Sequence, residues 1–175
     1  MLGDHELQSL PQEVELLPET GESFAENAIV KARTAAAATG LPALGEDSGI
    51  AVVALGGAPG IRSARFAGEN ATDEENLAKL IAEMEDVDDR RAAYVCALAY
   101  AEPDGEERLF EARCEGRLAR SPEGDGGFGY DPIFVADGSP RDNQTMASLS
   151  QPEKDAISHR GQAAKLLDAW LDSRE

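Results

Sequence analysis

Apolar residues recur at helical spacing in three segments of the chain, and each has signals for where a helix begins. Ser23 and Glu26 have the S-x-x-E order of a capping box and open an alanine-rich segment, which predicts a helix to about Thr39. A second capping box, Thr72 to Glu75, predicts a helix to about Glu85. Near the C-terminus one helical stripe collects Ala163, Leu166, Leu167, Trp170 and Leu171.

Other segments are continuous apolar or alternating runs, which are typical of strands. Residues 91–101 (RAAYVCALAYA) and 107–118 predict two antiparallel strands joined across an Asp-Gly turn. Residues 132–135 predict another short strand. The chain contains no repeat, low-complexity tract or linker. We therefore expect one α/β domain over residues 1–175, with a mixed β-sheet flanked by helices.

One apolar run is broken by polar residues. The stretch 41–55, LPALGEDSGIAVVAL, holds Glu46, Asp47, Ser48 and Gly49 between apolar residues that predict a short strand. A carboxylate at a strand end, followed by Ser and Gly, suits a metal ligand or a catalytic base. An Asx-turn or a helix cap explains the same letters without any chemistry. Both interpretations stay open on these residues alone.

The charge of the chain narrows its partners. Its 175 residues have a formal net charge of -18, which argues against binding to a nucleic acid backbone or an anionic membrane. A small anionic substrate remains possible where a cation and local Lys or Arg side chains hold it. The start of the chain has no secretory pattern, so we expect a cytoplasmic protein whose Cys96 and Cys114 are reduced thiols.

Two further stretches carry candidate chemistry. Residues 126–131, GGFGYD, combine flexible backbone with aromatic faces and a carboxylate, which suits stacking on a planar base and hydrogen bonding to its edge. A turn with two core aromatics is the alternative. Lys154, His159 and Arg160 precede the last amphipathic segment and could donate to carbonyl or phosphate oxygens. A solvated helix start is the alternative there.

Taken together, the motifs resemble the inosine triphosphate pyrophosphatase family. The matching segments are P-E-T-G, S-F-A-E-N-A-x-x-K-A, E-D-S-G, L-G-G-A-P-G-I-x-S-A-R-F, G-G-F-G-Y-D-P-I-F and K-x-A-I-S-H-R-G, spread from about residue 18 to residue 170. The resemblance implies an elongated two-lobed α/β fold with a long mixed sheet and an active-site cleft between the lobes. It also implies a homodimer that uses Mg²⁺ to hydrolyse inosine, deoxyinosine or xanthosine triphosphate to the monophosphate and pyrophosphate.

The resemblance also implies roles for single residues. Asp47 is similar to the family's catalytic base and metal-linked carboxylate, and Glu19 to its other metal carboxylate. Lys31 and Ser48 correspond to substrate contacts. The positions that correspond to the purine pocket are Phe128, Gly129, Tyr130, Asp131, Lys154, His159 and Arg160. Glu26 fits either a metal neighbour or a helix cap.

The chain departs from the family pattern at its start. The family's first strand and its phosphate-gripping loop are absent, so Met1 is either a misassigned start or the edge of a truncation. The first 21 residues resemble the tail of a helix followed by a short strand. We expect weak activity from the chain as given. The alternatives are a non-catalytic nucleotide-binding or dimer-partner protein, and a phosphatase of another type that would release orthophosphate.

Overall fold

The computed structural model describes residues 6–174; the question about Met1 lies outside them. The expected helix tail and short strand are wrong for the described part of this segment, because residues 6–22 form neither helix nor strand. Pro11 and Pro18 interrupt the segment, and no partner strand pairs with it among the described residues. Its leucines, such as Leu7 and Leu17, are exposed.

Two helices begin at the predicted caps. Helix α1 spans Phe24–Thr39, with the Ser23 hydroxyl accepting from the Glu26 amide, and it ends at Gly40 in the left-handed conformation. The Glu26 carboxylate accepts from the amide of Glu22 at 2.7 Å, so it satisfies a backbone donor next to the helix start. Helix α2 spans Asp73–Glu83, and its capping box is complete. Both predicted helices are confirmed.

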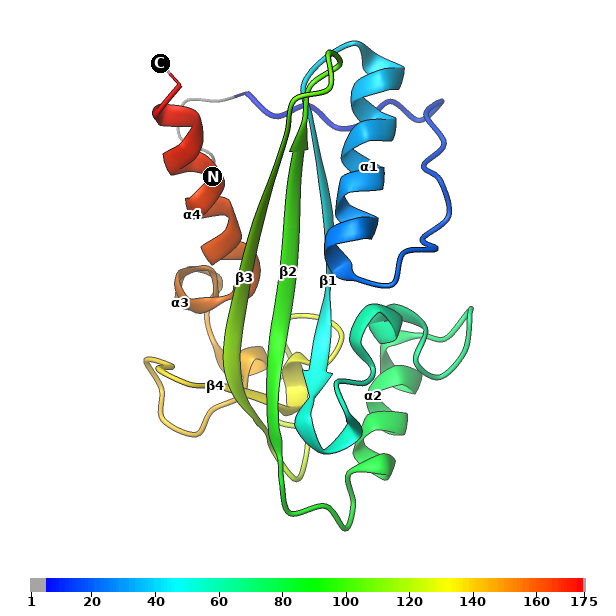
Figure 1. Cartoon of the computed structure of the whole chain (residues 1–175). Coiled ribbons are helices and arrows are strands. Elements are labelled where there is room, and N and C mark those ends of the chain that lie inside the picture. Colours follow the sequence, from blue (N-terminus) through cyan, green and yellow to red (C-terminus); the bar gives the residue numbers. More distant parts are fainter. Residues whose placement is uncertain (1–5, 175) are drawn as a thin grey trace. The chain divides into compact units, whose positions relative to one another are not determined.

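Four strands form one sheet in the order β1-β2-β3-β4 (Figure 1). They are β1 (Ala43–Val52), β2 (Arg91–Ala101), β3 (Glu107–Leu118) and β4 (Phe134–Ala136). We predicted a mixed sheet, whereas these four strands run antiparallel to their neighbours. Five residues join β2 to β3, a distance that permits a hairpin and excludes the crossover a parallel pair requires.

The polar run does not end a strand. Residues Glu46 to Gly49 lie inside β1, which continues to Val52, so the expectation of a carboxylate at a strand end is wrong. An antiparallel strand accepts polar residues where its backbone keeps its pairing and each side chain finds a partner. The reason for this polar run is therefore found in what its side chains contact.

The C-terminal part contains two helices. Helix α3 spans Gln151–Ile157 and α4 spans His159–Asp172. The predicted amphipathic helix is α4, whereas α3 was not predicted. Lys154 consequently lies within a helix, and His159 is the first residue of the next one.

The chain divides into two compact units, which we describe separately. Unit 1 contains residues 6–47, 96–112 and 160–174. Its sheet is covered on both faces: alanines of α1 pack on Ala97 and Ala99, whereas Leu167 of α4 packs with Leu98 and Tyr100. Side chains alternate between the faces of a strand, so α1 and α4 lie on opposite faces.

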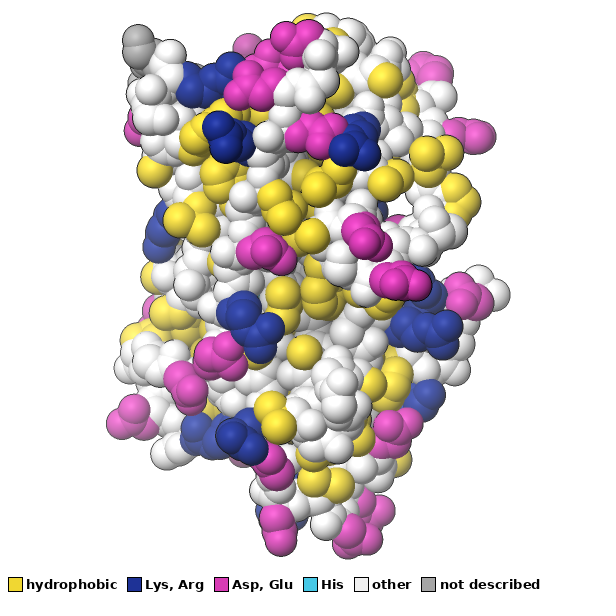
Figure 2. Space-filling model, in the orientation of Figure 1, with side chains coloured by type: hydrophobic (Ala, Val, Ile, Leu, Met, Phe, Trp, Pro, Cys, Tyr) yellow, Lys and Arg dark blue, Asp and Glu magenta, His cyan; other side chains and the backbone are white. Residues whose placement is uncertain are grey.

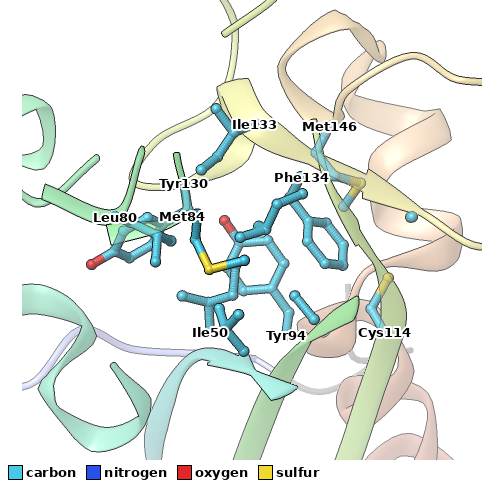
Figure 3. Packing of buried hydrophobic residues seen from close by; sticks show 13 residues of the cluster. Ile50, Leu80, Met84, Tyr94, Cys114, Tyr130, Ile133, Phe134 and Met146 are labelled. Carbon is cyan, nitrogen blue, oxygen red and sulfur yellow. The ribbon is translucent and has the colours of Figure 1, made fainter. Parts of the chain in front are cut away.

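Unit 2 contains residues 48–95 and 113–159 and holds the largest hydrophobic cluster. Aromatic, aliphatic and sulfur-containing side chains from α2, the sheet and the loop before β4 meet there (Figure 3). Phe134, Ile50 and Leu80 are fully buried at its centre. This cluster anchors the segment 126–134, where several candidate site residues lie.

The face of the molecule drawn in Figure 2 carries acidic side chains in dispersed form. On the face shown in Figure 2, Lys and Arg side chains lie among Asp and Glu side chains, with hydrophobic groups between them. No helix among residues 6–174 is both long and apolar enough to cross a bilayer.

Candidate functional site

Helix α1 lies directly against β1 at a glycine. A Cβ atom added to Gly45 would stand 2.3 Å from the carbonyl oxygen of Ala28 and 2.5 Å from the amide nitrogen of Ala32. Only glycine allows this close approach. The approach places Asn27 and Lys31, one turn apart on α1, beside Asp47 on the strand.

Asp47 is held by two donors and mostly shielded from solvent. Its relative exposure is 9%. The Asn27 side-chain amide donates to Oδ2 at 3.0 Å, and the Lys31 ammonium donates to Oδ1 at 3.2 Å. Burial nevertheless raises the pKa of Asp47, with the Asn27 and Lys31 contacts opposing that shift. The result is a carboxylate whose basicity is increased but whose ionised form is still supported.

The Lys31 ammonium lies between two carboxylates. It is 2.5 Å from Glu19 Oε1 and 3.2 Å from Asp47 Oδ1, and it also donates to the main-chain oxygen of Glu46 at 3.0 Å. Burial lowers the pKa of Lys31, but the two carboxylates outweigh it and the net shift is upward. Lys31, Glu19 and Asp47 therefore form one charged cluster in unit 1.

The donor set of this cluster fits a hard divalent cation. Mg²⁺ is usually bound by one or two protein carboxylates together with substrate phosphates and waters. Glu19 and Asp47 supply two carboxylates around one cationic nitrogen. Within residues 6–174 no group of three or more His, Cys, Asp and Glu side chains could hold a metal ion. Glu19 and Asp47 are the residues of this cluster that could hold such a cation.

On β1, the residue before Asp47 contacts a different helix. The Glu46 carboxylate accepts from Arg160 Nε of α4 at 3.2 Å and from the Cys96 thiol at 3.8 Å. Burial raises the pKa of Cys96 to about 12, and the charge of Glu46 adds to the shift. Cys96 and Cys114 are both buried and form no disulfide in the structure, and their reduced state stays a prediction.

In unit 2, Asp131 is the centre of a sealed polar cluster. Its relative exposure is 2%. Oδ1 accepts from the Tyr94 hydroxyl at 3.1 Å, and Oδ2 accepts from the Phe128 amide at 3.0 Å and from the Lys154 ammonium. A Cβ atom on Gly127 would collide with Oδ2. These contacts favour a role for Asp131 in fixing the loop and Lys154.

The two aromatic residues of the predicted loop have different surroundings. Tyr130 is buried in the hydrophobic cluster and donates to the main-chain oxygen of Ser63 at 2.8 Å. Phe128 is 54% exposed, and the Lys154 ammonium lies 4.4 Å from its ring centroid. The intervening Gly129 donates its amide to Asp73 of α2 at 2.8 Å. Phe128 is therefore the loop aromatic that presents a face to solvent.

His159 is placed by a tyrosine on β2. Its ring stacks on Tyr94, with centroids 4.7 Å apart and the planes 6° from parallel. Tyr94 also donates to Asp131, so one side chain links the two predicted pocket residues. Lys154 and His159 are both buried, at 8% and 5% exposure.

Sequence reasoning missed two supporting residues. Tyr94 lies in a predicted strand whose other residues are almost all apolar, and only its hydroxyl indicates a polar partner. Asn27 lies in the first predicted helix and was given no role, although its one-turn spacing from Lys31 predicts that the two side chains share a face. Ser48, which follows Asp47 on β1, is half-buried and belongs to unit 2; its role as a substrate contact stays a prediction.

Comparisons with known proteins agree on one family. The sequence model of the Ham1 family matches residues 1–170. A dITP/XTP pyrophosphatase of Escherichia coli is 52% identical over 158 residues, which cover 88% of this chain and 79% of the relative. A solved HAM1 protein from Coxiella burnetii superimposes with a TM-score of 0.85 at 46% identity, covering 91% of this chain and 82% of its own. The Staphylococcus aureus Ham1 protein gives a TM-score of 0.84 at 45% identity, with coverages of 90% and 81%.

Proposed function

The chain belongs to the Ham1 family, and we propose that it is a nucleoside triphosphate pyrophosphatase for non-canonical purines. Its substrates are inosine, deoxyinosine and xanthosine triphosphates, and its products are the monophosphate and pyrophosphate. The observation that carries this proposal is the cluster of Asp47, Lys31 and Glu19 in unit 1. Relatives named dITP/XTP pyrophosphatase, about half identical over most of the chain, support the substrate class.

Asp47 is the residue we propose as the general base. Water attacks the α-phosphorus, the bond to the bridging oxygen breaks, and pyrophosphate leaves. The water must lose a proton, and a carboxylate of raised pKa accepts it more readily than an ordinary one. The bonds from Asn27 and Lys31 orient the Asp47 carboxylate for this step. General base catalysis of this kind contributes about 10²–10⁴-fold to a rate.

Mg²⁺ is the cofactor we propose, held by Glu19 and Asp47. When bound, it offsets part of the negative charge of the triphosphate. The Lys31 ammonium sits on these same two carboxylates. With Glu19 and Asp47 holding the cation, the Lys31 ammonium would be available to bind the phosphates.

The residues proposed for base recognition are Phe128, Gly129, Tyr130, Asp131, Lys154, His159 and Arg160. In unit 2 the exposed ring of Phe128 offers a stacking face, and Lys154 over that ring adds a positive charge. His159 and Arg160 carry N–H donors that suit a 6-oxo purine. The 6-amino group of adenine is itself a donor, so it would face these donors without forming a hydrogen bond. Unpaired polar groups of this kind allow an enzyme to reject the wrong base strongly.

A homodimer and a cytoplasmic location belong to the same proposal. The homodimer rests on the family resemblance of the motifs, and both are accessible to direct measurement. Sedimentation analysis at several protein concentrations tests the dimer.

The deciding experiment measures products. The purified chain is incubated with deoxyinosine, xanthosine and adenosine triphosphates, with Mg²⁺ or with a chelator, and pyrophosphate and orthophosphate are assayed separately. We expect pyrophosphate from the 6-oxo purines only, and none with chelator. Orthophosphate would indicate another type of phosphatase. Tight nucleotide binding without product would favour a non-catalytic binding protein.

A further inference from the structure

The side chain of Glu46 touches none of the groups proposed for phosphate chemistry. Its carboxylate lies against Arg160 and Cys96, whereas Asp47 contacts Asn27 and Lys31. Successive side chains of a strand point to opposite faces. Glu46 therefore shares its face of β1 with Leu44, which packs in the cluster that contains Leu167 of α4.

We infer that Glu46 is a positioning residue that sets the orientation of the Arg160 guanidinium, and through it the discrimination between purine bases. This inference rests on the proposed function, because it assigns Arg160 to base recognition. Arg160 is the second residue of α4, so its backbone is fixed by the helix. The side chain that carries the planar guanidinium still has rotatable bonds, and the hydrogen bond from Nε to Glu46 at 3.2 Å restricts their rotation.

The carboxylate that orients Arg160 is itself held in place. Glu46 lies on a strand, and the buried Cys96 thiol donates to the same oxygen that Arg160 contacts. Cys96 is 1% exposed, so its thiol lies within packed surroundings. A recognition group works best when rigid elements and a second layer of contacts fix it.

A role in stability alone explains this arrangement poorly. The side chains of Glu46 and Arg160 are 33% and 43% exposed, and ion pairs that open to solvent contribute little to stability. An ordered guanidinium improves recognition instead, because less freedom is lost when the base binds.

Glu46 also lies next to the charged cluster of Lys31, Glu19 and Asp47. Its main-chain oxygen accepts from the Lys31 ammonium at 3.0 Å. A side-chain substitution leaves that oxygen in place, so the effect on base recognition can be separated from the effect on the reaction.

The test compares Glu46→Gln with the unchanged protein by steady-state kinetics on deoxyinosine and deoxyadenosine triphosphates. We expect the ratio of the two kcat/KM values to fall about 10-fold, the effect of one charge-assisted hydrogen bond. The loss should appear as a raised KM for the deoxyinosine nucleotide with kcat changed less than about 2-fold. Glu46→Asp, which keeps the charge, should lie between the two. If Glu46→Gln does not fold, Glu46→Asp carries the same comparison.

A double-mutant cycle and a matched control decide the mechanism. If Glu46 acts through Arg160, Glu46→Gln has no further effect on the ratio in an Arg160→Ala background. Independent, multiplying effects overturn the inference, as does a loss of kcat with an unchanged ratio. Glu102→Gln is the control, because Glu102 pairs with Arg174 at 2.9 Å in the same unit. It should leave the ratio unchanged.

Failure of the proposed function is recognised separately. If the unchanged protein releases no pyrophosphate, the proposed function fails. Calorimetric binding of deoxyinosine and deoxyadenosine monophosphates then reads the same discrimination without turnover. The inference is overturned if the unchanged protein binds the two monophosphates with equal affinity. It is also overturned if the difference between the two affinities is the same in Glu46→Gln.

Discussion

Two aspartate–lysine pairs among the described residues have different surroundings. Asp47 and Lys31 in unit 1 share their charge with Glu19, and Lys31 reaches a main-chain oxygen as well. Asp131 and Lys154 in unit 2 are closed in by a tyrosine hydroxyl and a backbone amide. The first pair has a second carboxylate, Glu19, beside the Lys31 ammonium, and two carboxylates together could hold a metal ion. The second has its carboxylate saturated by protein donors, so Asp131 fixes Lys154 and the loop that we propose to bind the base.

The comparison shows that residue type alone does not separate a chemical role from a structural one. Asp131 is 2% exposed and its two oxygens accept from three protein donors, against two donors for Asp47. Asp47 is 9% exposed, and burial raises its pKa despite two favourable contacts. A carboxylate left with a raised pKa stores unfavourable free energy in its charged form, which is a common property of functional acidic residues. The two pairs should therefore respond in opposite ways to loss of the carboxylate.

The largest effect is expected from Asp47→Asn. The amide cannot accept a proton from water, so kcat/KM for deoxyinosine triphosphate should fall about 10³-fold, or about 4 kcal/mol. The free energy of unfolding, measured in urea with chelator at neutral pH, should stay equal or rise, because the substitution removes a destabilised charge. A loss of stability in Asp47→Asn as large as that in Asp131→Asn would contradict the distinction between the two aspartate–lysine pairs.

Asp131→Asn is expected to have the largest effect on stability. The side-chain amide would face the Lys154 ammonium and the donors of Tyr94 and Phe128, and breaking a buried pair from one side costs about 3–5 kcal/mol. Urea unfolding checks this value. Asp125→Asn is the matched control, since Asp125 lies exposed on the same loop. An equal, small change in both variants would contradict the sealed description of Asp131.

Tyr94→Phe should have a smaller effect on the same cluster. The ring keeps its stacking on His159 and its packing on Phe134, while one hydrogen bond to a charged oxygen is lost. Such a bond contributes about 1.5–3 kcal/mol. A difference in unfolding free energy between Tyr94→Phe and the unchanged protein tests it. A double mutant with Asp131→Asn should lose less than the sum of the single losses.

The sequence predicted the fold class, the helices α1, α2 and α4, and the limits of β2 and β3, because capping boxes and apolar runs are local signals. It also predicted Glu19, Lys31 and Asp47, which the structure brings together. It missed α3, whose seven residues are too short for periodicity to show. It could not separate Tyr130, which is buried, from Phe128, which is exposed, because the burial of an aromatic side chain depends on tertiary packing. Tyr94 and Glu46 acquire their partners only across the sheet.

The smallest expected effect concerns the anchor of the sealed pair and depends on pH. Lys154 lies on α3, whose start is fixed by Glu153: its carboxylate accepts from the amide and hydroxyl of Ser150 at 2.9 and 2.6 Å. The Ser150 hydroxyl, with the Ser150 amide and Arg141, lowers the pKa of Glu153 to about 2. A lowered pKa stabilises the fold above the unfolded value of roughly 4.3, and that contribution is lost as the pH falls towards 2.

Glu153→Gln should therefore flatten the fall in urea midpoint between about pH 4.3 and pH 2. Asp47 has the opposite sign, because its pKa is raised. Without metal its charge destabilises the fold above the ordinary pKa, and protonation relieves this as the pH falls. Asp47→Asn should accordingly steepen the fall that Glu153→Gln flattens. If the urea midpoints of the two variants changed with pH in the same way, the opposite contributions of Glu153 and Asp47 to stability would be contradicted.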